Sequence, residues 1–153
     1  MQIDLHDMAK ADDDVNPEMP VVDRLVEVLP EVDDEPYLAV FALTHADKDH
    51  CLGFADLLEK VTIGELWATP RLWREYLDAP DGEGLCADAQ AFQEEAERRI
   101  AAVKAALGRN EAPARGDRII VIGYDTEHDS HAYDELPAKF KSGPGKLITS
   151  LDD

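Results

Sequence analysis

The segment FALTHADKDHCLGF, at positions 41–54, places four candidate metal ligands directly after an apolar run. These ligands are His45, Asp47, Asp49 and His50. Imidazole and carboxylate groups are a good ligand set for Zn²⁺, and they also suit Mn²⁺ or Fe. Four such groups in two pairs would suit two adjacent ions that stabilise charge developing on a phosphoryl or acyl oxygen. The spacing predicts a metal site, and a solvated acidic loop with incidental histidines is the competing explanation.

The run before these residues, Tyr37–Leu43, has the length and continuous apolarity of a strand buried on both faces, as in layered α/β folds. Side chains that follow the carboxyl end of such a strand face the crevice above the sheet, where α/β proteins place their sites. In an extended segment His45 and Asp47 share one face, because side chains alternate. Asp49 and His50 follow where the chain bends toward the next helix, so we expect a second pair there.

Helices and strands alternate along the rest of the chain, which predicts the α/β class. Apolar spacing predicts helices over 20–29, within 53–61 and from Ala89 to Leu107, and Gly108 is expected to end the last of these. Strands are expected at 63–70 and 118–123, with a further strand at 146–151. We expect a single domain over 1–153, with loop-rich segments at 1–19 and 126–146.

The composition limits the functions that the chain could have. Asp and Glu number 34 against 15 Lys and Arg, a formal net charge of −19, while 44% of the residues are hydrophobic. This balance argues against binding long nucleic acid directly and against docking on anionic membranes. No signal peptide or apolar spanning segment is evident, so a cytoplasmic protein is expected. The two cysteines make no disulfide framework; packing is favoured over metal ligation for Cys51 and over redox chemistry for Cys86.

The string THADKDH followed by CLGF resembles the H-x-[HD]-x-D-H motif of metallo-β-lactamase-fold hydrolases. The version with aspartate at the third position looks like that of the hydrolase domains of bacterial DNA-uptake channel proteins. The strings ELWATP and LCADAQAFQEEAERRI look like those of a bacterial subgroup of uncharacterised metallo-hydrolases. The resemblance covers residues 20–125, the core of the expected domain. It implies a partial metallo-β-lactamase-like αββα sandwich, corresponding to the first half of that fold.

By this resemblance, His45 and Asp47 would hold a first metal ion, and Asp49 and His50 a second. Asp49 would also be the catalytic residue, orienting a metal-bound hydroxide or taking its proton. The implied activity is metal-dependent hydrolysis of a phosphodiester, ester or lactam. The implied cofactor is one or two Zn²⁺ ions, with Mn²⁺ or Fe as substitutes. Because the chain is so acidic, a small or nucleotide-like substrate fits better than long nucleic acid.

The chain departs from the family pattern at both ends. The family opens with a hairpin that ends in an Asp-Gly-type turn, whereas this chain has MQIDLHDM. The family also continues to a G-D turn with a bridging aspartate and to a late histidine, and this sequence stops at KLITSLDD. Asp125, His128 and His131, which follow the strand expected at 118–123, are further candidates for a missing ligand.

A half fold would expose a sheet face and an unpaired edge. We therefore expect a homo-oligomer or a partner chain to complete it. The alternative to a hydrolase is a non-catalytic, truncated hydrolase-fold subunit that works through assembly with such a partner. An interaction protein whose acidic surface reflects a high-salt cytoplasm is compatible with either.

Overall fold

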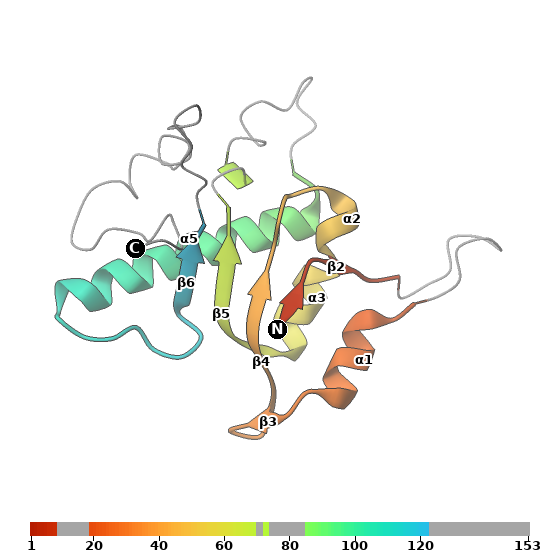
Figure 1. Cartoon of the computed structure of the whole chain (residues 1–153), viewed down its shortest axis with the longest axis horizontal. Coiled ribbons are helices and arrows are strands. Elements are labelled where there is room, and N and C mark those ends of the chain that lie inside the picture. Colours follow the sequence, from red (N-terminus) through yellow and green to blue (C-terminus); the bar gives the residue numbers. More distant parts are fainter. Residues whose placement is uncertain (9–18, 70–71, 74–84, 123–153) are drawn as a thin grey trace.

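The computed structural model of the chain describes residues 1–8, 19–69, 72–73 and 85–122. Its centre is a parallel sheet with strand order β1-β4-β5-β6 (Figure 1). These strands are β1 (Gln2–Ile3), β4 (Glu35–Ala42), β5 (Thr62–Ala68) and β6 (Arg118–Val121). The short β3 (Glu31–Val32) pairs antiparallel with the start of β4. The α/β class predicted from the sequence is confirmed.

The helices are α1 (Val21–Val28), α2 (Lys48–Cys51), α3 (Phe54–Lys60) and α5 (Ala87–Gly108). Helices α1, α3 and α5 correspond to the three helices predicted from apolar spacing. The strands predicted at 37–43, 63–70 and 118–123 correspond to β4, β5 and β6. Across the sheet Phe41 pairs with Leu66, and Leu66 with Ile119.

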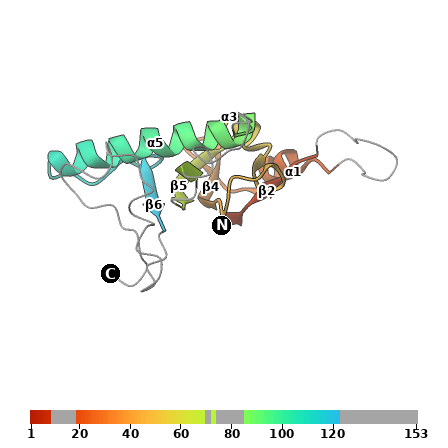
Figure 2. The same ribbon diagram turned by 90° about the horizontal axis from the view of Figure 1, so that it is seen from above.

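Helices α3 and α5 lie on the same face of the sheet (Figure 2). Between them and the sheet three phenylalanines meet, one from each layer: Phe41 of β4, Phe54 of α3 and Phe92 of α5, all fully buried. Their ring centroids are 4.9–5.9 Å apart. Aromatic pairs at such distances contribute about 0.5–1.5 kcal/mol beyond the burial of their area. This cluster fixes β4, and with it the segment that carries the histidines, against both helices.

Arg99 ties α5 to the ends of the strands where β5 and β6 begin. It is 2% exposed, and its guanidinium donates to the backbone oxygens of Ile63 at 3.0 Å and Arg118 at 3.2 Å. Its Nε donates to Glu95 Oε1 at 2.7 Å. Partial burial opposes ionisation of Glu95, but hydrogen bonds from Arg98 and Arg99 outweigh it and lower the pKa of that carboxyl. The buried guanidinium is therefore fully partnered.

The apolar stripe of α5 is only partly buried. Ala89, Phe92, Ala96 and Ile100 are fully buried, whereas Leu107 is 42% exposed. The helix runs past β6, the last strand of the sheet in the described chain (Figure 2), so its final turns have no strand to cover. The helix ends at Gly108, as expected from the sequence.

The N-terminal segment differs from the loop expected over 1–19. Residues 1–8 contain β1 and β2 (Leu5–His6), and β1 runs parallel to the end of β4. Alternation is clear from β2 onward, where Leu5 is 2% exposed, His6 is exposed and Asp7 is buried. Asp7 is buried and its Oδ1 accepts the amide N–H of Val22 at 2.9 Å, which secures the first turn of α1. Acidic residues in this segment thus serve as hydrogen-bond acceptors for the fold.

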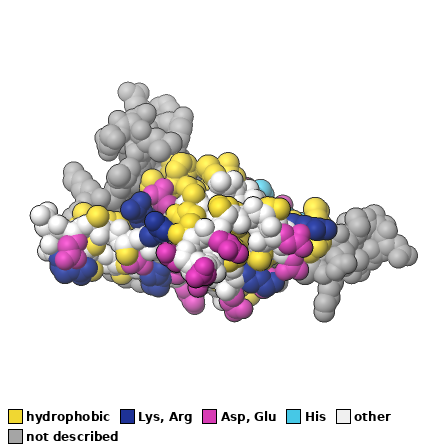
Figure 3. Space-filling view, turned by 90° about the horizontal axis from the view of Figure 1, so that it is seen from below, with side chains coloured by type: hydrophobic (Ala, Val, Ile, Leu, Met, Phe, Trp, Pro, Cys, Tyr) yellow, Lys and Arg dark blue, Asp and Glu magenta, His cyan; other side chains and the backbone are white. Residues whose placement is uncertain are grey.

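On the face of the sheet opposite α3 and α5, none of the described helices covers β5 (Figure 2). Glu65 and Trp67 lie half-buried on this face, and Trp67 Nε1 donates to Glu65 Oε1 at 2.6 Å. At the end of the molecule where the strands begin, basic, acidic and hydrophobic side chains are interspersed (Figure 3). Within the described residues, no helix is both long and apolar enough to cross a membrane. The strand expected at 146–151 and the loop-rich segment 126–146 lie outside the described residues.

Candidate metal centre

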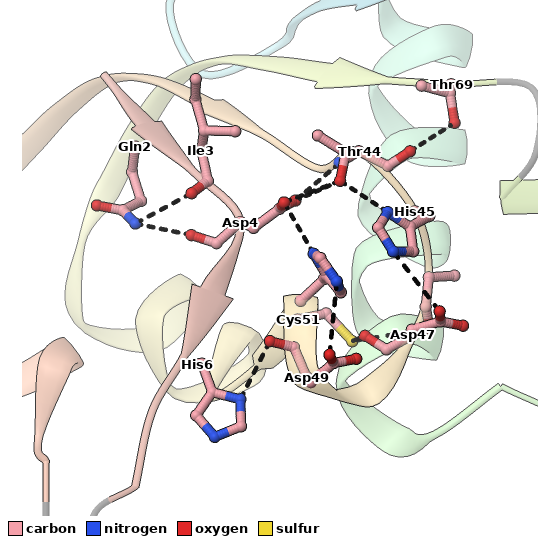
Figure 4. A network of polar contacts seen from close by, with 12 residues as sticks. Gln2, Ile3, Asp4, His6, Thr44, His45, Asp47, Asp49, Cys51 and Thr69 are labelled. Atoms are coloured by element: carbon pink, nitrogen blue, oxygen red, sulfur yellow. Dashed lines mark hydrogen bonds and ion pairs between the residues drawn. The ribbon is translucent and has the colours of Figure 1, made fainter.

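The four predicted ligands lie together beyond the carboxyl end of β4. The chain leaves the sheet after Leu43, whose N–H donates to the carbonyl of Trp67 at 3.0 Å. Asp47 is the N-cap residue of the short helix α2, which contains Asp49 and His50. Figure 4 shows His45, Asp47 and Asp49 grouped near Asp4 and Thr44. The two imidazole rings lie with centroids 3.7 Å apart and planes inclined by 44°. The positive φ of Gly53, +92°, then turns the chain into α3.

The structure places the two members of each predicted ligand pair close together. His45 Nε2 lies 3.6 Å from Asp47 Oδ2, and His50 Nε2 lies 3.5 Å from Asp49 Oδ2. Two ligand atoms that each bind a tetrahedral Zn²⁺ at about 2.0–2.1 Å lie about 3.4 Å from each other. Each pair is therefore spaced like one edge of a zinc coordination shell. Zinc binding at these two pairs stays a prediction.

Hydrogen bonds fix the other nitrogen of each ring. His50 Nδ1 lies 2.9 Å from Asp4 Oδ2, and His45 Nδ1 lies 2.8 Å from Thr44 Oγ1. The Thr44 hydroxyl also bonds Asp4 Oδ2 at 2.8 Å. A carboxylate only accepts, so the one hydroxyl proton goes to Asp4, and the hydroxyl must then accept from His45. Both histidines thus carry their proton on Nδ1 when neutral, and both leave the Nε2 lone pair available.

Asp4 organises this arrangement, and the sequence analysis did not identify it. Its backbone has a positive φ of 51°, and its N–H donates to the carbonyl of Ala42 at 2.9 Å. Its carboxylate accepts the backbone N–H of Thr44 at 2.8 Å in addition to the hydroxyl and imidazole bonds. The signal available in the sequence was an aspartate between two apolar residues, Ile3 and Leu5. Its partners are 40 and 46 residues away along the chain, so only the pairing of β1 with β4 reveals them.

The charges of Asp4 and His50 support each other. Burial opposes ionisation of Asp4, but the bonds from the Thr44 backbone, the His50 ring and the Thr44 hydroxyl outweigh it and lower its pKa. The hydrogen bond to Asp4 raises the pKa of His50, and Asp49 and Asp47 add to this effect. A metal ion at Nε2 would compete with a proton there. Because the pKa of His50 is raised, protons would compete with a metal ion for this ring at pH values above the usual pKa of histidine.

The site is open to solvent on its carboxylate side. The side chains of Asp47 and Asp49 are each 68% exposed, while those of His45 and His50 are 32% and 29% exposed. The described residues contain no group of three or more His, Cys, Asp or Glu side chains arranged to hold one metal ion. The further candidates Asp125, His128 and His131 lie outside the described residues. The described chain therefore brings the ligands together as two pairs.

Two further residues lie beside the four predicted ligands. His6 is exposed, and its Nδ1 lies 3.1 Å from the backbone oxygen of Asp49. Cys51 is fully buried, and its Sγ donates to the carbonyl of Asp47 at 3.3 Å. Burial raises the pKa of the Cys51 thiol. These features agree with the favoured packing role of Cys51.

A pocket of about 370 Å³ lies elsewhere in the fold. It is lined by Tyr37, Ala39, Val40, Gly64, Glu65, Arg115 and Arg118. These residues come from β4, β5, β6 and the segment before β6, and the lining includes none of the four predicted ligands. The chemistry expected from the histidines is thus separate from this pocket.

Comparisons with known proteins identify no relative: no family model matches the chain, and no curated protein or solved structure matches it. The functional argument therefore depends on the geometry of the site.

Proposed function

We propose that this chain is a metal-dependent hydrolase, or the metal-holding part of one, with its site at the carboxyl end of β4. The observation that carries the proposal is the fixed orientation of both histidines. Each Nδ1 is held by a protein acceptor, and each Nε2 is turned toward an aspartate at 3.5–3.6 Å. Metal-binding histidines characteristically donate their second ring N–H to a carboxylate or another acceptor. The resemblance of THADKDH to metallo-β-lactamase-fold hydrolases supports the same proposal.

His45 and Asp47 would hold one Zn²⁺, and Asp49 and His50 a second. Bound zinc would supply Lewis acidity toward a phosphoryl or acyl oxygen and lower the pKa of water at the site. By the resemblance, Asp49 would take part in proton transfer, and its side chain is 68% exposed to entering molecules. Asp4 and Thr44 position the histidines. The parallel sheet with helices on one face agrees with one half of an αββα sandwich.

The substrate in this proposal is a small or nucleotide-like phosphodiester, ester or lactam. Two features favour a small molecule: the chain carries a formal charge of −19, and the site is bordered by Asp47 and Asp49, both largely exposed. Repulsion by these charges opposes the approach of a long polyanion.

Metal stoichiometry tests the proposal directly. Full-length chain dialysed against Zn²⁺ should retain at least one equivalent by elemental analysis, and His45→Ala should lose most of it. His6→Ala is the matched control, since His6 lies beside Asp49 but contacts only its backbone. Less than half an equivalent in the unmodified chain, or equal retention in the His45 and His6 variants, would refute metal binding at this site.

A second candidate function is that of a non-catalytic subunit, and one observation favours it. Within the described residues the ligands form two pairs with no third side chain added to either. Such a chain would bind metal weakly and act through a partner that completes the fold. A screen with phosphodiester, ester and lactam substrates in Zn²⁺ or Mn²⁺ separates the two functions. Turnover that disappears in Asp49→Ala would exclude the subunit role.

A further inference from the structure

The two cysteines of the chain lie next to each other in the fold. Cys51, in α2, and Cys86, at the N-cap of α5, are free thiols whose Sγ atoms are 3.6 Å apart. They are 35 positions apart in the sequence, so their proximity is created by the packing of α2 against the start of α5. A disulfide has an S–S bond of about 2.05 Å. The sulfur atoms need to approach by about 1.5 Å to form one.

Both sulfur atoms are carried by well-anchored elements. The carbonyl of Cys86 accepts the N–H of Gln90 at 2.9 Å, which makes it part of the first turn of α5. Asp88 in the same turn accepts the N–H of Ala55 at 2.9 Å, which fixes the start of α5 to α3. Cys51 is fully buried among core residues. The short distance between the sulfur atoms is therefore a property of the packed core.

The two thiols differ in access. Cys86 is half-buried, whereas Cys51 is fully buried. A soluble oxidant can therefore reach Cys86 first, and Cys51 can then react within the protein. This is the arrangement of an attacking and a resolving thiol.

We propose that Cys51 and Cys86 form a reversible disulfide when the chain meets a low-molecular-weight disulfide such as oxidised glutathione. The Cys86 sulfur attacks one glutathione sulfur, forms a mixed disulfide and releases the first glutathione, which takes up the proton lost by Cys86. The Cys51 sulfur then attacks the Cys86 sulfur, and the second glutathione leaves with the proton from Cys51. The two protein thiols are oxidised by two electrons, and one glutathione disulfide is reduced to two thiols.

The bond would change the segment that carries the candidate ligands. Cys51 directly follows His50, and its thiol donates to the carbonyls of Asp47 at 3.3 Å and Ala46 at 3.9 Å. A disulfide sulfur has no proton to donate, so these bonds are lost on oxidation. Oxidation therefore attaches α2 covalently to α5 and removes one of the donors to the Asp47 carbonyl, which still accepts the N–H of His50 at 2.9 Å. The disulfide itself requires no metal, so its test is independent of the proposed hydrolase.

The experiment equilibrates full-length chain with glutathione buffers of increasing oxidised fraction, traps free thiols by alkylation and maps peptides by mass spectrometry. The expected product is a monomer in which the peptides of Cys51 and Cys86 are joined. Relative to the chain unfolded in urea, the bridge should form about 100-fold more favourably, because the fold already closes the loop. A stable glutathione adduct without a bridge, a bridge between two chains, or equal formation in urea would overturn the proposal.

Two variants test the order of attack. In Cys51→Ala, Cys86 should retain one glutathione, because no resolving thiol remains. In Cys86→Ala, Cys51 should stay unmodified while the chain is folded. Thermal melting of both variants shows that each is folded under the assay conditions. Rapid glutathione uptake by folded Cys86→Ala would contradict the assigned roles.

Discussion

Where β5 and β6 begin, Arg99 is enclosed by the partners that it needs, whereas beyond the carboxyl end of β4, His45 and His50 each turn one nitrogen toward an exposed carboxylate. The guanidinium has two backbone carbonyls and Glu95 within 3.2 Å. Each histidine has one nitrogen satisfied within 2.9 Å and the other at 3.5–3.6 Å from an aspartate. One polar cluster is closed and holds the fold together, while the other is held open on one side. That difference is the reason why we propose a ligand at the histidine cluster.

The largest expected effect on stability comes from removing Arg99, the centre of the closed cluster that it forms with Glu95 and two strand carbonyls. Arg99→Met should lower the free energy of unfolding by about 3–5 kcal/mol, because Glu95 and two strand carbonyls lose their buried partner. Urea denaturation monitored by circular dichroism measures this. Arg98→Met is the matched control on the same helix; that side chain is 50% exposed, so about 1 kcal/mol or less is expected. Equal losses in the two variants would show that enclosure of Arg99 is not what matters.

The second effect is on metal affinity at the open cluster, which consists of His45, His50, Asp47 and Asp49. Asp49→Asn should lower Zn²⁺ affinity by about 10- to 100-fold or more, and more than Asp47→Asn does. An amide oxygen can replace part of the carboxylate at Asp47, whereas Asp49 would serve both as ligand and in proton transfer. Neither change should alter melting much, because both side chains are 68% exposed. Isothermal titration of both variants decides this, and equal metal loss would reverse the assigned roles.

A smaller effect is expected from the residue that holds the histidines. Asp4→Asn should weaken Zn²⁺ binding by about 10-fold, since removing a group that orients a metal ligand typically costs this much or more. Asparagine tolerates the positive φ at this position, so the backbone is not expected to change. Gln2→Ala is a control within β1 that leaves the carboxylate in place. Unchanged zinc affinity in Asp4→Asn would mean that the hydrogen bonds at Nδ1 do not prepare the histidines for metal.

The smallest effect is a difference in pH dependence. The lowered pKa of Glu95 means that its stabilisation is present above the unfolded value of 4.5 and is lost as the pH falls below it. Because Glu95 is ionised in both the folded and the unfolded chain near neutral pH, the cost of Glu95→Gln should be constant there and should shrink as the pH falls through the lowered pKa. The raised pKa of His50 has the opposite sign: its stabilisation is full below 6.5 and is lost as the pH rises through the raised value. The cost of Asp4→Asn, measured by urea denaturation without metal, should therefore shrink as the pH rises above neutral. A constant cost would mean that the His50 charge contributes nothing.

The sequence was most informative where one local pattern decides the structure. The apolar run at Tyr37–Leu43 and the three-to-four-residue spacing around Phe92 predicted β4 and α5, because burial alone sets those periodicities. The sequence also indicated that His45 lies near Asp47 and Asp49 near His50, since neighbours in a turn can be inferred from sequence, while their role as metal ligands stays a prediction.

Contacts between distant segments were not predictable in this way. The bonds from Asp4 to Thr44 and His50 depend on the register of β1 against β4, and two residues of strand carry almost no periodic signal. The contact between Cys51 and Cys86 depends on how α2 packs against α5. In both cases residue types alone gave no indication of the partner.

The brevity of β1 has a consequence for hydrogen exchange. Only Gln2 and Ile3 pair with β4, and Ile3 is 56% exposed, whereas Leu5 and Asp7 after them are buried, so an opening confined to residues 1–4 breaks few contacts. Short terminal elements of this kind open locally at a small free-energy cost, without unfolding of the core. Each such opening takes Asp4 away from Thr44 and His50 while the phenylalanine cluster stays intact. The protection of the Thr44 amide should therefore be far below that of Phe41, and any metal that binds only the assembled histidine pair should raise it, because binding favours the closed form.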